Sequence, residues 1–120
     1  MKLKSVLDKV FSQYVRQSSA DHKGFVACFT CGVKHHWKVM HAGHYVTRYY
    51  TATRWDEENV HPQCSHCNIN LGGNLEAYRV KLDEVYGKGK ANELHRKSQK
   101  TTKLHEHEIA DLLLIYRDKL

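Results

Sequence analysis

The sequence predicts a small α+β domain, in which short strands form a central core and helices flank that core at both ends. Three observations support this fold class. The chain has 120 residues, which suits one domain with a modest hydrophobic core. Apolar residues recur at helical spacing near both ends of the chain, and two closely spaced cysteine pairs enclose a middle segment with strand-like runs.

The N-terminal half is expected to begin with an amphipathic helix over residues 3–15. Its apolar positions recur every three or four residues: Leu3, Val6, Leu7, Val10, Phe11, Tyr14 and Val15. A polar break over 18–24 follows. The runs 25–28 and 33–40 are then expected to form short strands, and 45–47 to continue the strand character.

The C-terminal half is expected to be mainly helical after one further strand at 60–63. Apolar residues at helical spacing predict a helix that begins near Leu75 and ends before Gly87, a residue type favoured just after a helix. A short helix around Leu94 and a last helix from about Leu104 complete the chain.

The composition indicates a polyanionic partner. Nineteen Lys and Arg residues oppose 13 Asp and Glu, which gives a net charge of +6. The excess is concentrated in residues 1–23 and 88–104, although two solvated faces would give the same pattern. No apolar run is long enough to span a membrane, and the first residues carry charges where a secretory signal is continuously apolar. We therefore expect a protein that is neither membrane-bound nor secreted.

The four cysteines have the spacing of a zinc site. They form two C-x-x-C pairs separated by 32 residues: Cys28, Cys31, Cys64 and Cys67. Two such knuckles place four thiolates around a tetrahedral Zn²⁺ ion, whereas two disulfides would require an oxidising compartment. We expect a structural zinc ion in a single domain, 1–120, with an N-terminal helix (1–23), a zinc-stapled core (24–87) and a basic helical extension (88–120).

The segment around the cysteine pairs contains the residue types that phosphodiester hydrolysis requires. Such a reaction needs a base that deprotonates water, a cation that stabilises the developing negative charge, and groups that aim both. His44 lies in a strand context that holds a side chain rigidly, and Asn59 precedes the second cysteine pair. Asn68 directly follows Cys67. This order of His, Asn and Asn beside a zinc knuckle is that of an HNH, or ββα-metal, nuclease.

Several motifs in residues 24–87 resemble those of a phage family. They are Ala42-Gly43-His44, the run Ala52-Thr53-Arg54-Trp55-Asp56-Glu57-Glu58-Asn59-Val60-His61-Pro62-Gln63-Cys64, Cys67-Asn68, Gly72-Gly73-Asn74 and Tyr86-Gly87. Together they are similar to the phage NinG/Rap family of recombination nucleases. The resemblance implies an HNH-like ββα-metal core, and a metal-dependent endonuclease that hydrolyses branched DNA, such as Holliday junctions and D-loops, in phage recombination.

The resemblance also implies roles for individual residues. His44 matches the general base, and Asn59 matches the residue that braces the loop between the strands and helps to orient that base. Asn68 matches a ligand of one catalytic Mg²⁺ or Mn²⁺ ion, and the four cysteines match ligands of a structural zinc ion. A phage- or prophage-encoded protein of this kind would act in the cytoplasm of the bacterial host.

One position departs from the superfamily pattern. Many HNH sites place an Asp immediately before the base as a second metal ligand, and this chain has Gly43 there. Either Asn68 holds the ion together with phosphate oxygens and water, or another side chain substitutes. His41 is the candidate substitute, because the link through Ala42 and Gly43 could turn it inward. Residues 41 and 44 of a regular strand face opposite sides, which argues against this.

Basic side chains are the candidate DNA contacts. Two of them bracket the segment after the base, and four lie in the C-terminal extension: Arg48, Arg54, Lys88, Lys90, Arg96 and Lys97. We expect Trp55 to anchor the hydrophobic core, as large aromatic residues do in small domains. His61 has two interpretations, a packed strand residue or a neighbour of the active site.

A zinc-stapled DNA-binding module without catalysis is the alternative function, with Gly43 marking a lost ion site. In both interpretations the partner is DNA, and the resemblance implies branched DNA. Paired incisions on a junction would suit a homodimer. The last helix carries an apolar run that is wider than one helix face requires: Leu112, Leu113, Leu114 and Ile115.

Overall fold

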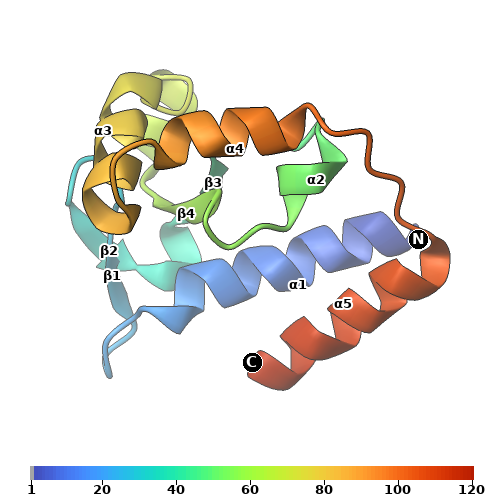
Figure 1. Ribbon diagram of the computed structural model, residues 1–120. Coiled ribbons are helices and arrows are strands. Elements are labelled where there is room, and N and C mark those ends of the chain that lie inside the picture. Colours follow the sequence, from blue (N-terminus) through green and yellow to red (C-terminus); the bar gives the residue numbers. More distant parts are fainter. Residues whose placement is uncertain (1) are drawn as a thin grey trace.

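The computed structural model describes residues 2–120 as helices and two small antiparallel sheets, which confirms the α+β class (Figure 1). The helices are α1 (Leu3–Ser18), α2 (Thr51–Arg54), α3 (Leu75–Tyr86), α4 (Lys90–Ser98) and α5 (Glu106–Lys119). The strands are β1 (Phe25–Ala27), β2 (Lys34–His36), β3 (His41–His44) and β4 (Val60–Gln63), and two short helical turns are η1 (Trp37–Val39) and η2 (His66–Asn70). No helix in the described part of the chain has the length and apolar character needed to cross a membrane.

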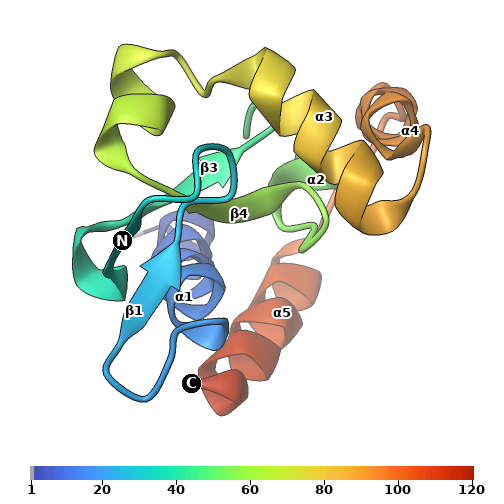
Figure 2. The same cartoon turned by 90° about the vertical axis from the view of Figure 1, so that its left-hand side faces the viewer.

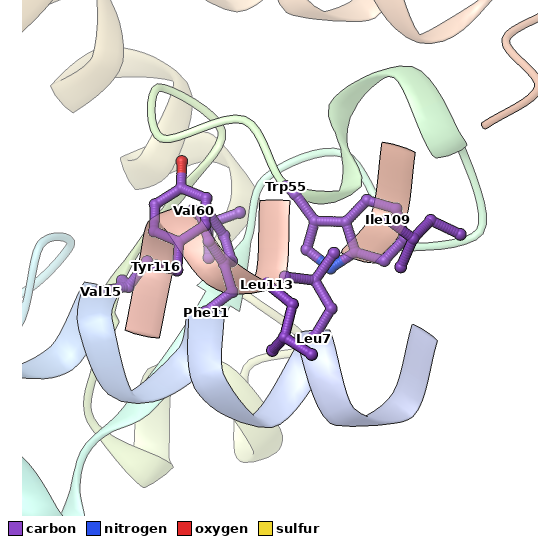
Figure 3. Close-up of a cluster of buried hydrophobic side chains, with 8 residues drawn as sticks. All are labelled: Leu7, Phe11, Val15, Trp55, Val60, Ile109, Leu113 and Tyr116. Atoms are coloured by element: carbon purple, nitrogen blue, oxygen red, sulfur yellow. The ribbon is translucent and has the colours of Figure 1, made fainter. Parts of the chain in front are cut away.

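Helices α1 and α5 lie side by side and run in the same direction (Figure 1). The predicted apolar face of α1 is buried, and the Phe11 ring meets the Tyr116 ring of α5 edge-on with centroids 4.8 Å apart. Trp55 is buried in the same cluster, so the prediction that it anchors the core is confirmed. Figure 3 shows the cluster, whose buried members are Leu7, Phe11, Val15, Trp55, Val60, Ile109, Leu113 and Tyr116.

Glu57 ties these two helices to the loop that precedes β4. The Tyr14 hydroxyl of α1 donates to Glu57 Oε1 at 2.9 Å, and the Tyr116 hydroxyl of α5 donates to Glu57 Oε2 at 2.9 Å. Lys119 adds an ion pair with the same carboxylate at 3.6 Å. One exposed carboxylate therefore links elements from the two ends of the chain to the loop that leads to Asn59.

Strands β3 and β4 lie between α1 on one side and the segment from η2 to α3 on the other (Figure 2). In their antiparallel register His44 pairs with Val60 and Gly43 pairs with His61. Because side chains alternate along a strand, Ala42 and His44 share the face that meets α1. From the other side, the buried Tyr78 hydroxyl of α3 donates to the Gly43 carbonyl at 2.7 Å.

A second hydrophobic cluster joins α3 and α4 to the chain that leaves β3. Its buried members are Tyr45, Val46, Tyr78, Leu82, Ala91 and Leu94. The Asp83 carboxylate accepts a hydrogen bond from the Ala91 backbone N–H at 3.0 Å, which fixes the start of α4 against the end of α3. Gly87 lies between these helices with φ +108°, a conformation that favours glycine, and α3 ends before it as predicted.

Two expectations for local structure were wrong, and one short helix was not expected. Residues 33–40 form only the short strand β2, because the chain then turns into η1, where His36 Nδ1 accepts from the Lys38 N–H. Residues 45–47 form no strand, because the backbone N–H groups of Tyr45 and Val46 bond to the backbone and side chain of Asn59 instead of to a neighbouring strand. The single-turn helix α2 was not expected at all.

Candidate functional site

The four cysteines converge from two separate knuckles. Cys28 follows β1 and Cys64 follows β4, while Cys31 and Cys67 come three residues later in each case. All four Sγ atoms lie within 4.8 Å of one another. Gly32, with φ +82°, provides the turn of the first knuckle, and its N–H donates to the Cys28 carbonyl at 2.9 Å.

The geometry of this cluster fits a zinc ion. A tetrahedral site with Zn–S bonds of about 2.3 Å places its sulfurs about 3.8 Å apart, and the Cys31 and Cys64 sulfurs are 3.7 Å apart. All four cysteines are free thiols, which contradicts the alternative of two disulfides. The buried packing around them includes Val26 and Met40. The cluster therefore could bind one structural zinc ion and join the β1–β2 sheet to the β3–β4 sheet.

Hydrogen bonds prepare Cys28 for the thiolate form that a metal requires. Burial alone raises the pKa of its thiol, but the Thr30 hydroxyl at 3.4 Å and backbone N–H groups of the knuckles stabilise the thiolate. Their combined effect lowers the pKa of Cys28, whereas burial and neighbouring sulfurs raise the pKa of Cys31 and of Cys64, so Cys28 is the first of these three thiols to lose its proton. Similar contacts reach the second pair, where the Cys67 N–H donates to Cys64 Sγ at 3.4 Å.

A polar cleft of about 360 Å³ lies between α1 and β3. Its lining brings together two of the three predicted catalytic residues, His44 and Asn68. The remaining lining residues come from α1, from β3 and from the loop after β3: Asp8, Phe11, Ser12, Ala42, Thr47 and Arg48. The cleft thus combines a histidine, an amide and charges of both signs at the end of β3.

His44 is oriented by a backbone carbonyl. Its Nε2 atom lies 2.9 Å from the backbone oxygen of Arg54, at the end of α2. Because a carbonyl can only accept, the neutral imidazole carries its proton on Nε2 and its lone pair on Nδ1. No other hydrogen bond to this ring occurs within residues 2–120. Burial lowers the pKa of His44, which outweighs the opposing effects of the Arg54 carbonyl and the Asp8 charge.

Asn59 is buried and bridges the loop between β3 and β4. Its amide Nδ2 donates to the Val46 carbonyl at 2.9 Å and to the Thr53 carbonyl at 3.0 Å. Its Oδ1 accepts from the Val46 N–H at 2.9 Å. These bonds fix the two ends of the loop that contains Arg54, whose carbonyl meets His44. Asn59 lies outside the cleft lining.

Asn68 and His41 lie next to each other. The Asn68 Nδ2 and His41 Nδ1 atoms are 3.2 Å apart, which leaves the Asn68 Oδ1 without a hydrogen bond in the described part of the chain. His41 is not among the residues that line the cleft with His44, as the alternation of β3 requires. It nevertheless contacts the residue that is predicted to hold the ion.

The space beside Gly43 is filled by Gln63, its diagonal neighbour across the β3–β4 pair. A Cβ atom added to Gly43 would overlap the Gln63 side-chain amide. Gln63 is fully buried, and its Nε2 donates to the Gly73 carbonyl at 2.8 Å and to the Thr30 hydroxyl at 3.1 Å. Its Oε1 has no hydrogen-bond partner among residues 2–120. This packing leaves no room for an Asp side chain at position 43.

Asp8 is a residue of the cleft that sequence reasoning missed. It lies on the polar side of α1, next to the buried Leu7, and a lone acidic residue on an amphipathic helix carries no signal of function. Its carboxylate accepts from Arg54 Nε at 3.1 Å and from a terminal Arg54 nitrogen at 2.5 Å. The Trp55 indole N–H donates to it at 3.0 Å, and Arg48 lies 3.7 Å away.

The predicted DNA contacts differ in how free their charges are. Arg54 is engaged by Asp8, Lys97 pairs with Asp56 at 2.5 Å, and Lys90 pairs with Glu58 at 3.0 Å and Glu93 at 3.3 Å. The Arg48 side chain is 68% exposed at the rim of the cleft. Two other predicted contacts, Lys88 and Arg96, are exposed, and Arg96 lines a separate groove with Lys97 and Lys100.

His61 is a packed strand residue and not a neighbour of the cleft. Its ring stacks on Phe29 with centroids 3.9 Å apart. Its Nδ1 lies 3.1 Å from the Tyr78 hydroxyl, and its Nε2 lies 2.8 Å from the Tyr86 hydroxyl. Burial lowers the pKa of His61 to about 4, so the ring is neutral at ordinary pH.

The fold and the cysteine cluster define a small α+β protein with a site suited to a structural zinc ion. The family profile described as "NinG: Bacteriophage Lambda NinG protein" matches residues 2–120. The chain therefore belongs to the NinG family of bacteriophage proteins, which confirms this part of the resemblance.

Three relatives illustrate the similarity, and all are described as "Protein ninG". The one from Salmonella phage P22 is 31% identical over 115 residues, which are 85% of this chain and 55% of the relative. Those from Escherichia phage 933W and Escherichia phage lambda are 31% and 30% identical over 104 residues, 78% of this chain and 50% of each relative. The chain thus spans about half the length of these relatives. No solved structure matches this chain.

Proposed function

We propose that this protein is a metal-dependent DNA endonuclease of the HNH type that acts on branched DNA. The observation that carries the proposal is the orientation of His44: its Nε2 faces the Arg54 carbonyl at 2.9 Å, and the ring lines a polar cleft together with Asn68. A general base needs a lone pair, a fixed orientation and room for substrate, and this arrangement supplies all three.

The order of elements supports the same type of site. Two antiparallel strands, β3 and β4, are followed directly by η2 and α3, and the cysteine cluster lies where β4 meets η2. His44 ends the first strand, Asn59 precedes the second, and Asn68 lies on η2. This order of elements supports the proposal of an HNH core, in which a zinc ion at the cysteine cluster would hold the parts together.

The chain's own residues would act as follows. His44 Nδ1 accepts a proton from a water molecule, and the Arg54 carbonyl stabilises the resulting imidazolium through the Nε2–H bond. Asn59 keeps that carbonyl in place by bridging Val46 and Thr53. Arg48, at the rim of the cleft, contacts the phosphate backbone.

The donor set of the cleft fits a Mg²⁺ or Mn²⁺ ion that is held mainly by substrate and water. The Asn68 side-chain oxygen is a suitable ligand, and Mg²⁺ commonly uses only one or two protein ligands in addition to phosphate oxygens and waters. Asp8 is the acidic residue in the lining, and its charge is balanced by Arg54 and Arg48. When bound, the ion would stabilise negative charge on the phosphate and on the leaving oxygen.

Exposed basic residues on α4 and just after it extend the proposed DNA surface. Arg96, Lys97 and Lys100 line a groove of about 490 Å³ that also contains Ala52 of α2. Because Ala52 and Arg54 belong to the same short helix, and the Arg54 carbonyl meets His44, α2 connects this groove to the cleft. Phosphate contacts at both would make affinity fall steeply with salt concentration.

The experiment uses the zinc-loaded chain and a labelled four-way DNA junction. We expect nicks with Mg²⁺ or Mn²⁺, no nicks when both ions are left out of the reaction, and weaker competition from linear duplex than from unlabelled junction. Binding without nicking under all ion conditions would contradict the enzyme and favour the non-catalytic DNA-binding module, which the packing of Gln63 beside Gly43 also fits. Equal competition by linear duplex would contradict the preference for branched DNA.

A further inference from the structure

We propose that Asp8 of α1 is a positioning residue that fixes His44 through Arg54, so that the N-terminal helix forms part of the functional site. The proposal rests on the proposed function for the role of His44. It concerns a contact between elements that are far apart in sequence, since Arg54 is 46 residues from Asp8.

First, the Asp8 carboxylate binds two side chains at the end of α2. Its two carboxylate oxygens bind the Arg54 guanidinium at 3.1 Å and 2.5 Å, and one of them also accepts from the Trp55 indole at 3.0 Å. A bidentate carboxylate–guanidinium pair fixes orientation as well as distance. The Arg54 guanidinium also lies 4.9 Å from the Trp55 ring centroid, so the two side chains form one unit.

Second, α2 depends on contacts with the rest of the protein to keep its position. It has only four residues, and a single helical turn is not stable by itself. The last carbonyls of a helix have no partners within it, and that of Arg54 is met by His44. A shift of Arg54 therefore removes the acceptor that selects the Nε2–H tautomer of His44.

The third step concerns charge. The Asp8 and Arg54 side chains are 19% and 20% exposed, so each would be costly to leave unpaired. Asp8 also lies 3.7 Å from Arg48, but the Arg48 side chain is 68% exposed, so this contact is weak. Asp8 is engaged by Arg54 and Trp55, so it is not free to act as a metal ligand.

The test measures the tautomer of His44 directly. Histidine-labelled, zinc-loaded protein is examined by ¹H–¹⁵N NMR at about pH 8, where a surface histidine is neutral, and His44 is assigned from the spectrum of His44→Ala. We expect an Nε2–H ring in the wild type and a mixture of tautomers in Asp8→Ala. Glu76→Gln, which breaks the exposed Glu76–Arg79 pair, is the control and should leave His44 unchanged.

Cleavage of the junction gives the second readout. Asp8→Ala should lower kcat by about 10- to 100-fold, the effect of a small misplacement of a reacting group, without weakening DNA binding, because it adds net positive charge. Asp8→Asn keeps an acceptor for Trp55 but loses the charge that pairs with Arg54. It should lower kcat less than Asp8→Ala does, and it is the test variant if Asp8→Ala does not fold. Far-ultraviolet circular dichroism monitors folding, because Trp55 itself contacts Asp8.

An unchanged His44 tautomer in folded Asp8 variants would overturn the proposal, whatever the rate. A raised Mg²⁺ requirement with that unchanged tautomer would overturn it too, since it would make Asp8 a metal ligand. If the wild type does not cleave DNA at all, the proposed function fails, but the NMR comparison still decides whether Asp8 positions His44.

Discussion

His44 Nε2 lies 2.9 Å from the backbone oxygen of Arg54, although ten residues separate them in the chain. A backbone carbonyl cannot be changed by substitution at its own residue, so the orientation of the imidazole depends on the fold of the loop between β3 and β4. Asn59 braces that loop from within, and Asp8 holds its Arg54 side chain from α1.

The pH dependence of nicking should report the environment of His44. Burial lowers the pKa of His44 below its ordinary value of 6.5, and a base is active only when neutral. The rate should therefore rise with pH to a midpoint below about 6.5 and be flat above neutrality. Single-turnover rates at saturating junction and Mg²⁺ measure this profile. A midpoint above 7, or a flat profile from acid to neutral pH, would count against His44 as the base.

Asn59→Ala should destabilise the fold. The substitution removes three hydrogen bonds from a fully buried amide and leaves the Val46 carbonyl and N–H without partners, whereas the Thr53 carbonyl keeps the Asp56 N–H at 3.3 Å. We expect a loss of roughly 3 kcal/mol in the free energy of unfolding, since unsatisfied buried groups cost about 1–3 kcal/mol each. Urea unfolding followed by tryptophan fluorescence measures it. Asn70→Ala, at an exposed position, is the matched control, and equal stability of the two variants would contradict the bracing role.

Gly43→Ala should be destabilising because of Gln63. The added Cβ overlaps the Gln63 amide, and overpacking of this kind costs about 1–3 kcal/mol. Gln63→Ala removes the overlapping atoms, so the double variant should be more stable than the sum of the two single effects predicts. Urea unfolding of all four proteins completes the cycle. Strict additivity would show that Gln63 does not exclude a side chain at position 43.

Zinc should be required for the fold. Structural zinc contributes on the order of 10–16 kcal/mol in small zinc domains, as much as or more than the whole stability of a typical domain. We expect one zinc ion per chain by elemental analysis, and loss of both zinc and the cooperative unfolding transition in Cys64→Ser. Ser65→Ala, at the exposed neighbouring position, should retain both. Full zinc content in Cys64→Ser would show that the ion is held elsewhere.

Sequence spacing predicted the elements whose signals are local. The helical spacing of apolar residues predicted α1 and α3, and Gly87 predicted the end of α3. The two C-x-x-C pairs predicted the cysteine cluster that the structure contains. The loop between β3 and β4 was mispredicted, because the Asn59 side chain replaces a strand partner at Val46. That substitution depends on a contact across 13 residues, which no local pattern encodes.

The residues of the cleft were also only partly predictable from local sequence patterns. His44 and Asn68 could be selected from their order beside a cysteine pair, but Asp8 could not, since its partners are Arg54 and Trp55 on a distant loop. Likewise, nothing in the sequence around Gly43 indicates that Gln63 fills the adjacent space. Tertiary packing alone determines both features.

The central claim is that His44 is the base of a nuclease, and the most direct measurement compares junction nicking by the wild type and by His44→Ala. Loss of a general base typically costs 10²–10⁴-fold, so we expect a single-turnover rate at least about 100-fold lower, with unchanged junction affinity and zinc content. His22→Ala, at an exposed histidine far along the chain from the cleft, should behave as the wild type. Nicking by His44→Ala at the wild-type rate would contradict the claim.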